Sequence, residues 1–181
     1  MDIIKEERKI LNEVCNEFLT EKWLSKIIDS YVGYQLVEER FEDGSLKIRY
    51  QTRFGERHGK FTQYKKDGTI ILECYYKDDK KNGEAKVFHK NGMLNIICYY
   101  KDGLIDGESK ELNSKGELLE QSFYKAGKLE GELKRWYSSN NQLALLIMYK
   151  DDKKDGCYKM WDKDGQLLLT CNFKNDSKID N

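Results

Sequence analysis

The stretch that decides the fold is GEAKVFHKNGMLNIICYYKDGLID, residues 83–106. It opens on a glycine, reaches a large apolar residue five positions later, passes an Asn-Gly pair and ends on two tyrosines and a second glycine-bearing turn. The same pattern starts again at Gly107, so the stretch is one unit of a 24-residue repeat. A fixed period of this length predicts a repeat architecture, in which stacked units share one continuous packed surface.

Five such units follow one another. Their opening glycines are Gly59, Gly83, Gly107, Gly131 and Gly156. Their turn pairs are Asp67-Gly68, Asn91-Gly92, Lys115-Gly116, Asn140-Asn141 and Asp164-Gly165. Their closing aromatic residues are Tyr76, Tyr100, Tyr124, Tyr149 and Phe173. The fourth interval is one residue longer, and we expect the extra residue in the turn before Asn141, where insertions are tolerated best.

A divergent unit precedes these five. The segment Phe41-Glu42-Asp43-Gly44-Ser45-Leu46 lies 24 residues before the next turn of the same kind, but Thr52 stands where the closing aromatic belongs. Counting it, we expect about six units over residues 33–181.

Each unit has the features of a β-hairpin. A run of four to six residues leads to an Asp-Gly or Asn-Gly pair, which tolerates the positive φ of tight turns. A longer run rich in β-branched and aromatic residues follows, as in residues 70–76. The fold class predicted is therefore mainly β: an elongated, twisted antiparallel meander of tandem hairpins, spanning roughly 60 Å at ~4.8 Å between strands.

At this point the residues resemble a known family. The arrangement of glycine, Glu or Lys, aromatic, Asn-Gly turn and Tyr-Lys-x-Gly-Lys is similar to the MORN repeat, in the 24-residue variant of bacterial and giant-virus proteins. The best single match is Tyr124-Lys125-Ala126-Gly127-Lys128-Leu129-Glu130-Gly131-Glu132. The acidic pairs Asp78-Asp79 and Asp151-Asp152 depart from the pattern, because they stand where the second turn would carry glycine. The resemblance implies a scaffold or attachment module, and for some members binding to acidic phospholipids.

The first 32 residues differ from the repeats. Apolar residues at helical spacing form two stripes, around Val14 and around Ile27, which would lie on nearly opposite sides of one helix. A break with Thr20 as the N-cap of a second helix fits better, so we expect a helical hairpin. We expect it to cap the open edge of the first unit; binding a partner or a membrane surface are the alternatives.

Composition excludes several classes of protein. Lys+Arg and Asp+Glu are both 32, and this balance argues against a general nucleic-acid binder. No apolar run approaches the ~20 residues of a membrane span. The five cysteines include no C-x-x-C pair, which favours free thiols. We expect an intracellular, soluble protein of the cytoplasm, with the nucleus and a membrane periphery left open.

The chain shows no catalytic constellation. His58 and His89 are the only histidines, and neither has a Cys, His or carboxylate set at a catalytic or zinc spacing. Cys74, Cys98 and Cys171 share one repeat position, but equivalent residues of adjacent units lie ~10 Å apart, too far for a disulfide or a shared metal ion. We therefore expect no catalytic residue, no metal site, no cofactor and no enzymatic activity.

Two sets of residues are candidates for a binding surface. Three positions after four of the opening glycines stand Lys86, Lys110, Lys134 and Lys159, which in register would form a basic ladder on one face. Glutamates two positions earlier should point to that same face, so a solvated row of Glu–Lys pairs is the plainer interpretation. Tyr75, Tyr99 and Phe123 form a second ladder, on the face opposite to the closing aromatics, and are candidate interface residues.

Three functions are compatible with these observations. The first is a non-enzymatic protein-interaction scaffold or adaptor that self-associates, as a homodimer, and docks an unknown protein partner on the ribbon. The second is a peripheral membrane adaptor that binds anionic phospholipids through the lysine ladder. The third is an antitoxin or viral effector that binds one host macromolecule.

Overall fold

The computed structural model describes residues 33–179, and β-strands joined by short turns account for this part of the chain. The strands are β1 (Tyr34–Arg40), β2 (Leu46–Arg53), β3 (Glu56–Tyr64), β4 (Ile70–Lys77), β5 (Lys80–Phe88), β6 (Leu94–Lys101), β7 (Leu104–Leu112), β8 (Leu118–Lys125), β9 (Lys128–Leu129), β10 (Gly131–Trp136), β11 (Leu143–Lys150), β12 (Lys153–Trp161), β13 (Leu167–Lys174) and β14 (Ser177–Ile179). The expected helical hairpin of residues 1–32, and the boundary drawn there, lie outside the described residues.

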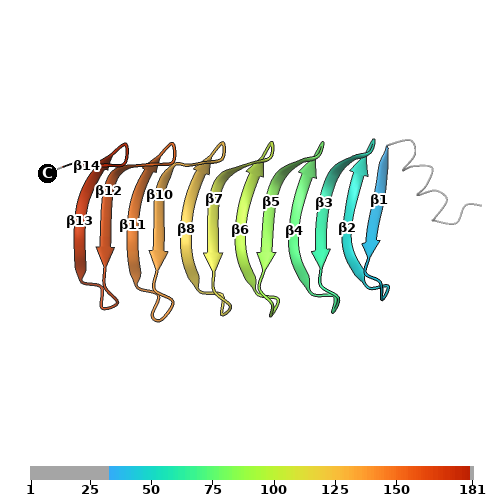
Figure 1. The fold of residues 1–181 in the computed structure, drawn as a ribbon, viewed down its shortest axis with the longest axis horizontal. Helices are drawn as coiled ribbons and strands as arrows, with labels where there is room; N and C mark the ends of the chain where they lie inside the picture. Colours follow the sequence, from blue (N-terminus) through green and yellow to red (C-terminus); the bar gives the residue numbers. More distant parts are fainter. Residues whose placement is uncertain (1–32, 180–181) are drawn as a thin grey trace, which may run out of the picture.

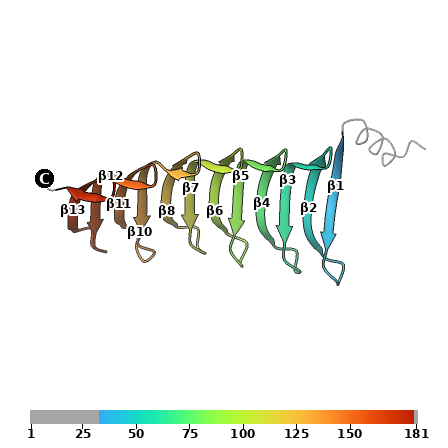
Figure 2. The same ribbon diagram turned by 45° about the horizontal axis from the view of Figure 1, so that its top comes forward.

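The strands form one open antiparallel sheet in sequence order, with β9 pairing only with β8. Figure 1 shows them side by side in a single row, from β1 at one end to β13 and β14 at the other. Figure 2 shows that the row is one layer deep along its whole length. The predicted elongated meander is confirmed, and its six hairpins are β1–β2, β3–β4, β5–β6, β7–β8, β10–β11 and β12–β13.

The expectation that the first strand of each unit is the shorter one is wrong for four of the six hairpins. β3, β5, β7 and β12 have nine residues, whereas their hairpin partners have eight. The first strand is longer because pairing resumes directly after a two-residue turn, several residues before the opening glycine. In β5, for example, Lys80 already pairs with Lys77, and the glycine comes three positions later.

The opening glycine sits at a β-bulge. Tyr76 pairs with Lys81 and Cys74 pairs with Ala85, so Tyr75 lies opposite three residues of β5. Gly83, the middle one of these three, has φ +107°. A side chain is strained in this region of φ and ψ, whereas glycine enters it readily. The repeated glycine therefore marks the place where each hairpin bends.

The turns at the lower edge of the sheet in Figure 1 carry the Asp-Gly and Asn-Gly pairs. Only the second residue of the pair takes a positive φ, as at Gly68 (+83°). Asp67 instead accepts a hydrogen bond from the Thr69 amide at 2.8 Å, which fixes the turn through its side chain. In the fourth unit the extra residue lies in this turn, as expected, because Asn141 donates to Tyr137 four residues back.

The upper turns bind one another across the repeats. Each donates a backbone N–H to the strand that leaves the preceding upper turn, at 2.8–3.1 Å. The pairs are Asp79 to Arg57, Gly103 to Lys81, Gly127 to Ile105, Asp152 to Leu129 and Asp176 to Lys154. Where Asp replaces glycine, its carboxylate also accepts the amide of that strand, as Asp152 does from Leu129 at 2.8 Å. The acidic pairs that depart from the repeat pattern thus keep the turn, with positive φ at Asp78 and Asp79, and add a hydrogen bond.

Candidate interaction surface

Alternation along each strand gives the ribbon two faces with different chemistry. We call one the packed face; its central row of cross-strand neighbours is Phe61, Cys74, Ala85, Cys98, Ser109, Ser122, Leu133, Ile147, Tyr158 and Cys171. Most of this row is buried although the sheet has one layer, and Cys74 has no exposed surface. Small residues lie in the middle of the row while larger ones rise beside them: Phe61, Tyr76, Tyr100 and Ile105 pack against Cys74, Ala85 and Cys98.

The cysteine thiols and the closing aromatic rings of the packed face take part in this packing. Burial raises the pKa of the Cys74 and Cys98 thiols, which keeps them protonated and unreactive. Cations cover the closing aromatics: the Arg57 guanidinium lies 4.3 Å from the centre of the Tyr76 ring, and the Lys81 ammonium 4.9 Å from that of Tyr100. The thiols and aromatic rings of the packed face therefore find their contacts within the chain itself.

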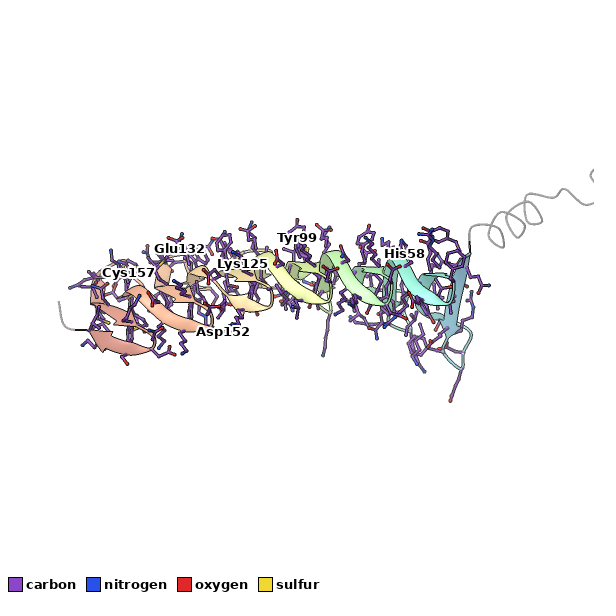
Figure 3. The ribbon with its side chains drawn as sticks, turned by 90° about the horizontal axis from the view of Figure 1, so that it is seen from above. His58, Tyr99, Lys125, Glu132, Asp152 and Cys157 are labelled. Carbon is purple, nitrogen blue, oxygen red and sulfur yellow. The ribbon has the colours of Figure 1, made fainter. Side chains whose placement is uncertain are left out.

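We call the other side of the ribbon the charged face, and it carries two rows. The lysine row consists of Thr62, Glu73, Lys86, Ile97, Lys110, Gln121, Lys134, Leu146, Lys159 and Thr170, each paired in register with the next. The glutamate row lies two residues along each strand and consists of Lys60, Tyr75, Glu84, Tyr99, Glu108, Phe123, Glu132, Met148, Cys157 and Asn172. In Figure 3, Tyr99, Glu132 and Cys157 lie on the same side of the ribbon.

The four lysines predicted as a ladder do lie in one row, but three of them are paired. The ammonium groups of Lys86, Lys110 and Lys134 lie 2.5, 2.7 and 2.5 Å from a carboxylate oxygen of the glutamate two residues earlier in the same strand. This is the geometry that the plainer interpretation of the sequence predicts. At Lys159 the corresponding position holds Cys157, and no carboxylate of the described residues lies within ion-pair distance of this lysine.

The series breaks at its N-terminal end. Thr62 takes the lysine position there and is 5% exposed. The cation moves to the neighbouring row instead, where Lys60 lies 2.5 Å from Glu73 across the strand pair. An ion pair between a lysine and a glutamate is thus kept in this unit, although it joins two strands and uses different positions.

The three candidate interface aromatics are the most accessible rings in the repeated part of the charged face. Tyr75 and Tyr99 are 43% exposed and Phe123 is 36% exposed. Each follows the strand position of the lysine row by two residues, so the rings stand between the ion pairs at one ring per unit. The structure therefore brings both sets of predicted residues, lysines and aromatics, onto a single surface.

The remaining candidate reactive groups serve structural contacts. His58 lies within β3, and its Nδ1 is 3.1 Å from a carboxylate oxygen of Asp78. His89 donates to the Leu112 carbonyl of the next unit at 2.8 Å. Within residues 33–179 no three His, Cys, Asp or Glu side chains gather as a metal site would require. Cys74, Cys98, Cys157 and Cys171 are free thiols.

Sequence reasoning missed one contact of this surface. Gln121 of the lysine row donates to Glu108 at 2.5 Å and joins the Glu108–Lys110 pair of β7 to β8, the other strand of the same hairpin. The pKa of Glu108 is lowered by the hydrogen bond from Lys110 and then by that from Gln121. The signal for this contact was weak, because glutamine occupies the position in one unit only.

Comparison with known families decides what the repeat is. The model described as MORN repeat variant matches residues 57–78, 81–102 and 154–175, and these segments cover most of the hairpins β3–β4, β5–β6 and β12–β13. These three segments of the chain are MORN repeats. Hairpins β7–β8 and β10–β11 lie outside the matched segments, yet they share the strand register of the matched ones. MORN repeats are generally associated with interaction with proteins or membranes.

Other comparisons give less. Among curated proteins none matches the chain. Among solved structures, a mutant of S. aureus TarM in complex with Fondaparinux, alpha-GlcNAc-glycerol and UDP aligns with a TM-score of 0.37 and 14% identity, over 84% of this chain and 27% of that one. A second TarM crystal structure aligns with a TM-score of 0.33 and 14% identity, over 83% and 27% of the two chains. The chain thus spans about a quarter of the length of TarM, and this likeness is too remote to bear on function. No helix among the described residues is long and apolar enough to cross a membrane.

Proposed function

We propose that this protein is a non-enzymatic interaction scaffold that docks a protein partner on its charged face. The observation that carries the proposal is the exposure of Tyr75, Tyr99 and Phe123 in one regular series, whereas the other rings of the described residues, apart from Phe54, are at least partly buried. Tyrosine and phenylalanine are enriched at protein interfaces, where burying a ring removes a large apolar area from water. Regular spacing of the rings offers a partner one anchor per repeat.

The charge pattern favours a protein partner over a lipid surface. Anionic phospholipids attract basic segments by net charge. In the lysine row, however, three lysines are already neutralised by glutamates at 2.5–2.7 Å. A surface with alternating signs suits a protein with complementary charges, which gains specificity from the pattern rather than from net charge.

A non-enzymatic role agrees with the state of the reactive groups. The thiols of Cys74 and Cys98 are buried, and His89 and the aspartates of the upper turns hold neighbouring repeats together. An open depression of about 300 Å³ lies between two upper turns, and its walls are Lys125, Ala126, Lys128, Glu130 and Asp151. These side chains come from turns and strand ends, and Lys128 is paired with Asp151.

The experiment is affinity capture with three versions of the full chain. The wild type is compared with a variant carrying Tyr75→Ser, Tyr99→Ser and Phe123→Ser, and with a control carrying Met93→Ser, Leu104→Ser and Leu168→Ser, which are exposed apolar residues elsewhere. We expect proteins retained by the wild type and the control to be lost with the aromatic variant, while circular dichroism shows that all three are folded. Identical sets retained by all three versions would show that the charged face is not the docking surface.

Vesicles give the second arm. Co-sedimentation with vesicles containing phosphatidylserine should recover little protein. Recovery that falls steeply with salt, and that is lost when Lys86, Lys110, Lys134 and Lys159 are changed to glutamine, would favour the lipid adaptor instead.

A further inference from the structure

The two rows of the charged face carry opposite charge. The glutamate row contributes Glu84, Glu108 and Glu132; Tyr99 and Phe123 stand between them, and Met148 follows Glu132. The lysine row contributes Lys86, Lys110, Lys134 and Lys159. Since the rows are two residues apart in each strand, they run side by side along the ribbon at a separation of ~7 Å.

Both rows repeat with the period of the hairpin. Two strands per unit advance the pattern by ~10 Å. A partner that meets a charge in every unit must therefore present charges with the same period over the same length. A second copy of this ribbon has that period by construction, whereas an unrelated globular surface has none.

Symmetry selects one arrangement of two copies. A twofold axis parallel to the strands places each row against the same row of the other copy, so that glutamate meets glutamate. A twofold axis along the length of the ribbon reverses the strands but keeps the order of the units, so the glutamate row faces the lysine row. Like charges juxtaposed across an interface are strongly unfavourable, and the second arrangement avoids them.

We infer that the charged face binds the charged face of a second copy in a parallel dimer, with its twofold axis along the ribbon. This inference rests on the proposed function, because it names the partner of the proposed docking surface. In this dimer the glutamate of each Glu–Lys pair faces the lysine of the same pair in the second copy. Glu108 and Lys110 of both copies therefore form a cluster of four charges. Between these clusters, Tyr99 meets Ile97 and Met148 meets Leu146.

The face is large enough for such a dimer. Twelve strands at ~4.8 Å and a width of three side-chain rows give about 60 Å by about 15 Å, or ~900 Å² per copy, against the ~800 Å² per partner of a stable interface. Two ribbons of the same twist can also stay in contact while they wind about a common axis. The match of charge, period and area is why a second copy is favoured over an unrelated chain.

Charge reversal tests the pairing. A variant with Lys86→Glu, Lys110→Glu and Lys134→Glu makes both rows acidic, and one with Glu84→Lys, Glu108→Lys and Glu132→Lys makes both rows basic. In sedimentation velocity we expect the wild type to be a dimer and each variant to dimerise roughly a hundredfold more weakly. An equimolar mixture of the two variants should form dimers again. The control Lys66→Glu, Lys90→Glu, Lys115→Glu changes the charge equally in the lower turns and should remain dimeric.

Energy transfer tests the orientation. Lys159→Cys is placed in a Cys157→Ser background and labelled separately with donor and acceptor dyes. In the parallel dimer the two labels lie close together and transfer should be high; in the antiparallel dimer they lie near opposite ends and transfer should be low. The equivalent pair of labels at Lys86→Cys, in β5 near the middle of the ribbon, should give high transfer in either orientation and therefore reports dimerisation alone.

The outcomes separate this inference from the proposed function. A monomeric wild type, a mixture that stays monomeric or low transfer within a dimer each overturn the parallel dimer. If the wild type is monomeric but still captures a protein through Tyr75, Tyr99 and Phe123, the scaffold function stands with a different partner. If capture is also unaffected by those substitutions, both proposals fail.

Discussion

The packed face and the charged face come from the same strands and even from adjacent residues, yet they are stabilised in different ways. On the packed face, small side chains such as Cys74 and Ala85 are enclosed by larger neighbours within the chain. On the charged face, long lysine and glutamate side chains form ion pairs within one strand, as Lys110 and Glu108 do. The aromatic rings of this face remain accessible to solvent. A single-layer sheet has no second layer to cover either face. The contrast indicates that one face maintains the fold, and that the other is available for binding.

The largest effect should come from a cavity on the packed face. Leu133→Ala removes a side chain that is 5% exposed and should lower the free energy of unfolding by about 2–4 kcal/mol. Leu36→Ala makes the same change on the charged face, where the side chain is 60% exposed, and should cost less than about 1 kcal/mol. Urea denaturation of both variants measures the difference. Equal losses of unfolding free energy in the two variants would contradict the conclusion that the packed face maintains the fold and the charged face does not.

An intermediate effect is expected from overpacking. Ala85→Leu adds three carbon atoms to a site that is 5% exposed between Cys74 and Cys98, and should destabilise the chain by about 1–3 kcal/mol. Lys86→Leu places the same side chain on the next residue of β5, facing the opposite side, and should leave the unfolding midpoint nearly unchanged. Thermal melts followed by circular dichroism compare the two. If Lys86→Leu were the more harmful, the charged face would be part of the core.

The smallest effect should come from a single charge pair. Lys110→Met removes an exposed ion pair and should change the free energy of unfolding by less than about 1 kcal/mol at neutral pH. Because Lys110 and then Gln121 lower the pKa of Glu108, that carboxylate adds stability above its unfolded pKa and loses it as the pH falls through its folded pKa. Lys110→Met should therefore flatten the acid side of a stability–pH profile. An unchanged acid side would mean that the pair does not act on Glu108.

Much of the fold followed from the repeat. Turns at Asp67-Gly68 and Asn91-Gly92 positioned the hairpins correctly, since these pairs specify tight turns through local backbone preference. The alternation of Cys74, Tyr75 and Tyr76 assigned side chains to faces, because successive residues of a strand point to opposite sides. Both are local rules, and they hold whatever surrounds the strand.

Other features could not be predicted locally. The acidic pair Asp78-Asp79 departs from the turn pattern of the repeat, but the Asp79 carboxylate accepts hydrogen bonds from Arg57, 22 residues away. The early pairing of Lys80 with Lys77 before the bulge made the first strands longer than expected. Such contacts depend on how one repeat lies against the next, which a single unit does not reveal.

The candidate surface was likewise predictable in part from the sequence. The register of the repeat was sufficient to place Lys86, Lys110, Lys134 and Lys159 in one row, and the rings of Tyr75, Tyr99 and Phe123 in another row on the face opposite to the closing aromatics. Whether those lysines are free or paired, and which side of the ribbon is buried, depended on distances between side chains.

The sequence by itself therefore determined the number of hairpins, their turns and the two sets of side chains, because period and alternation are properties of the chain. Only the tertiary structure decided that the Cys74 side is packed and the Tyr75 side is accessible. Burial depends on the neighbours that cross-strand pairing and the glycine bulges bring together, and those neighbours come from other repeats.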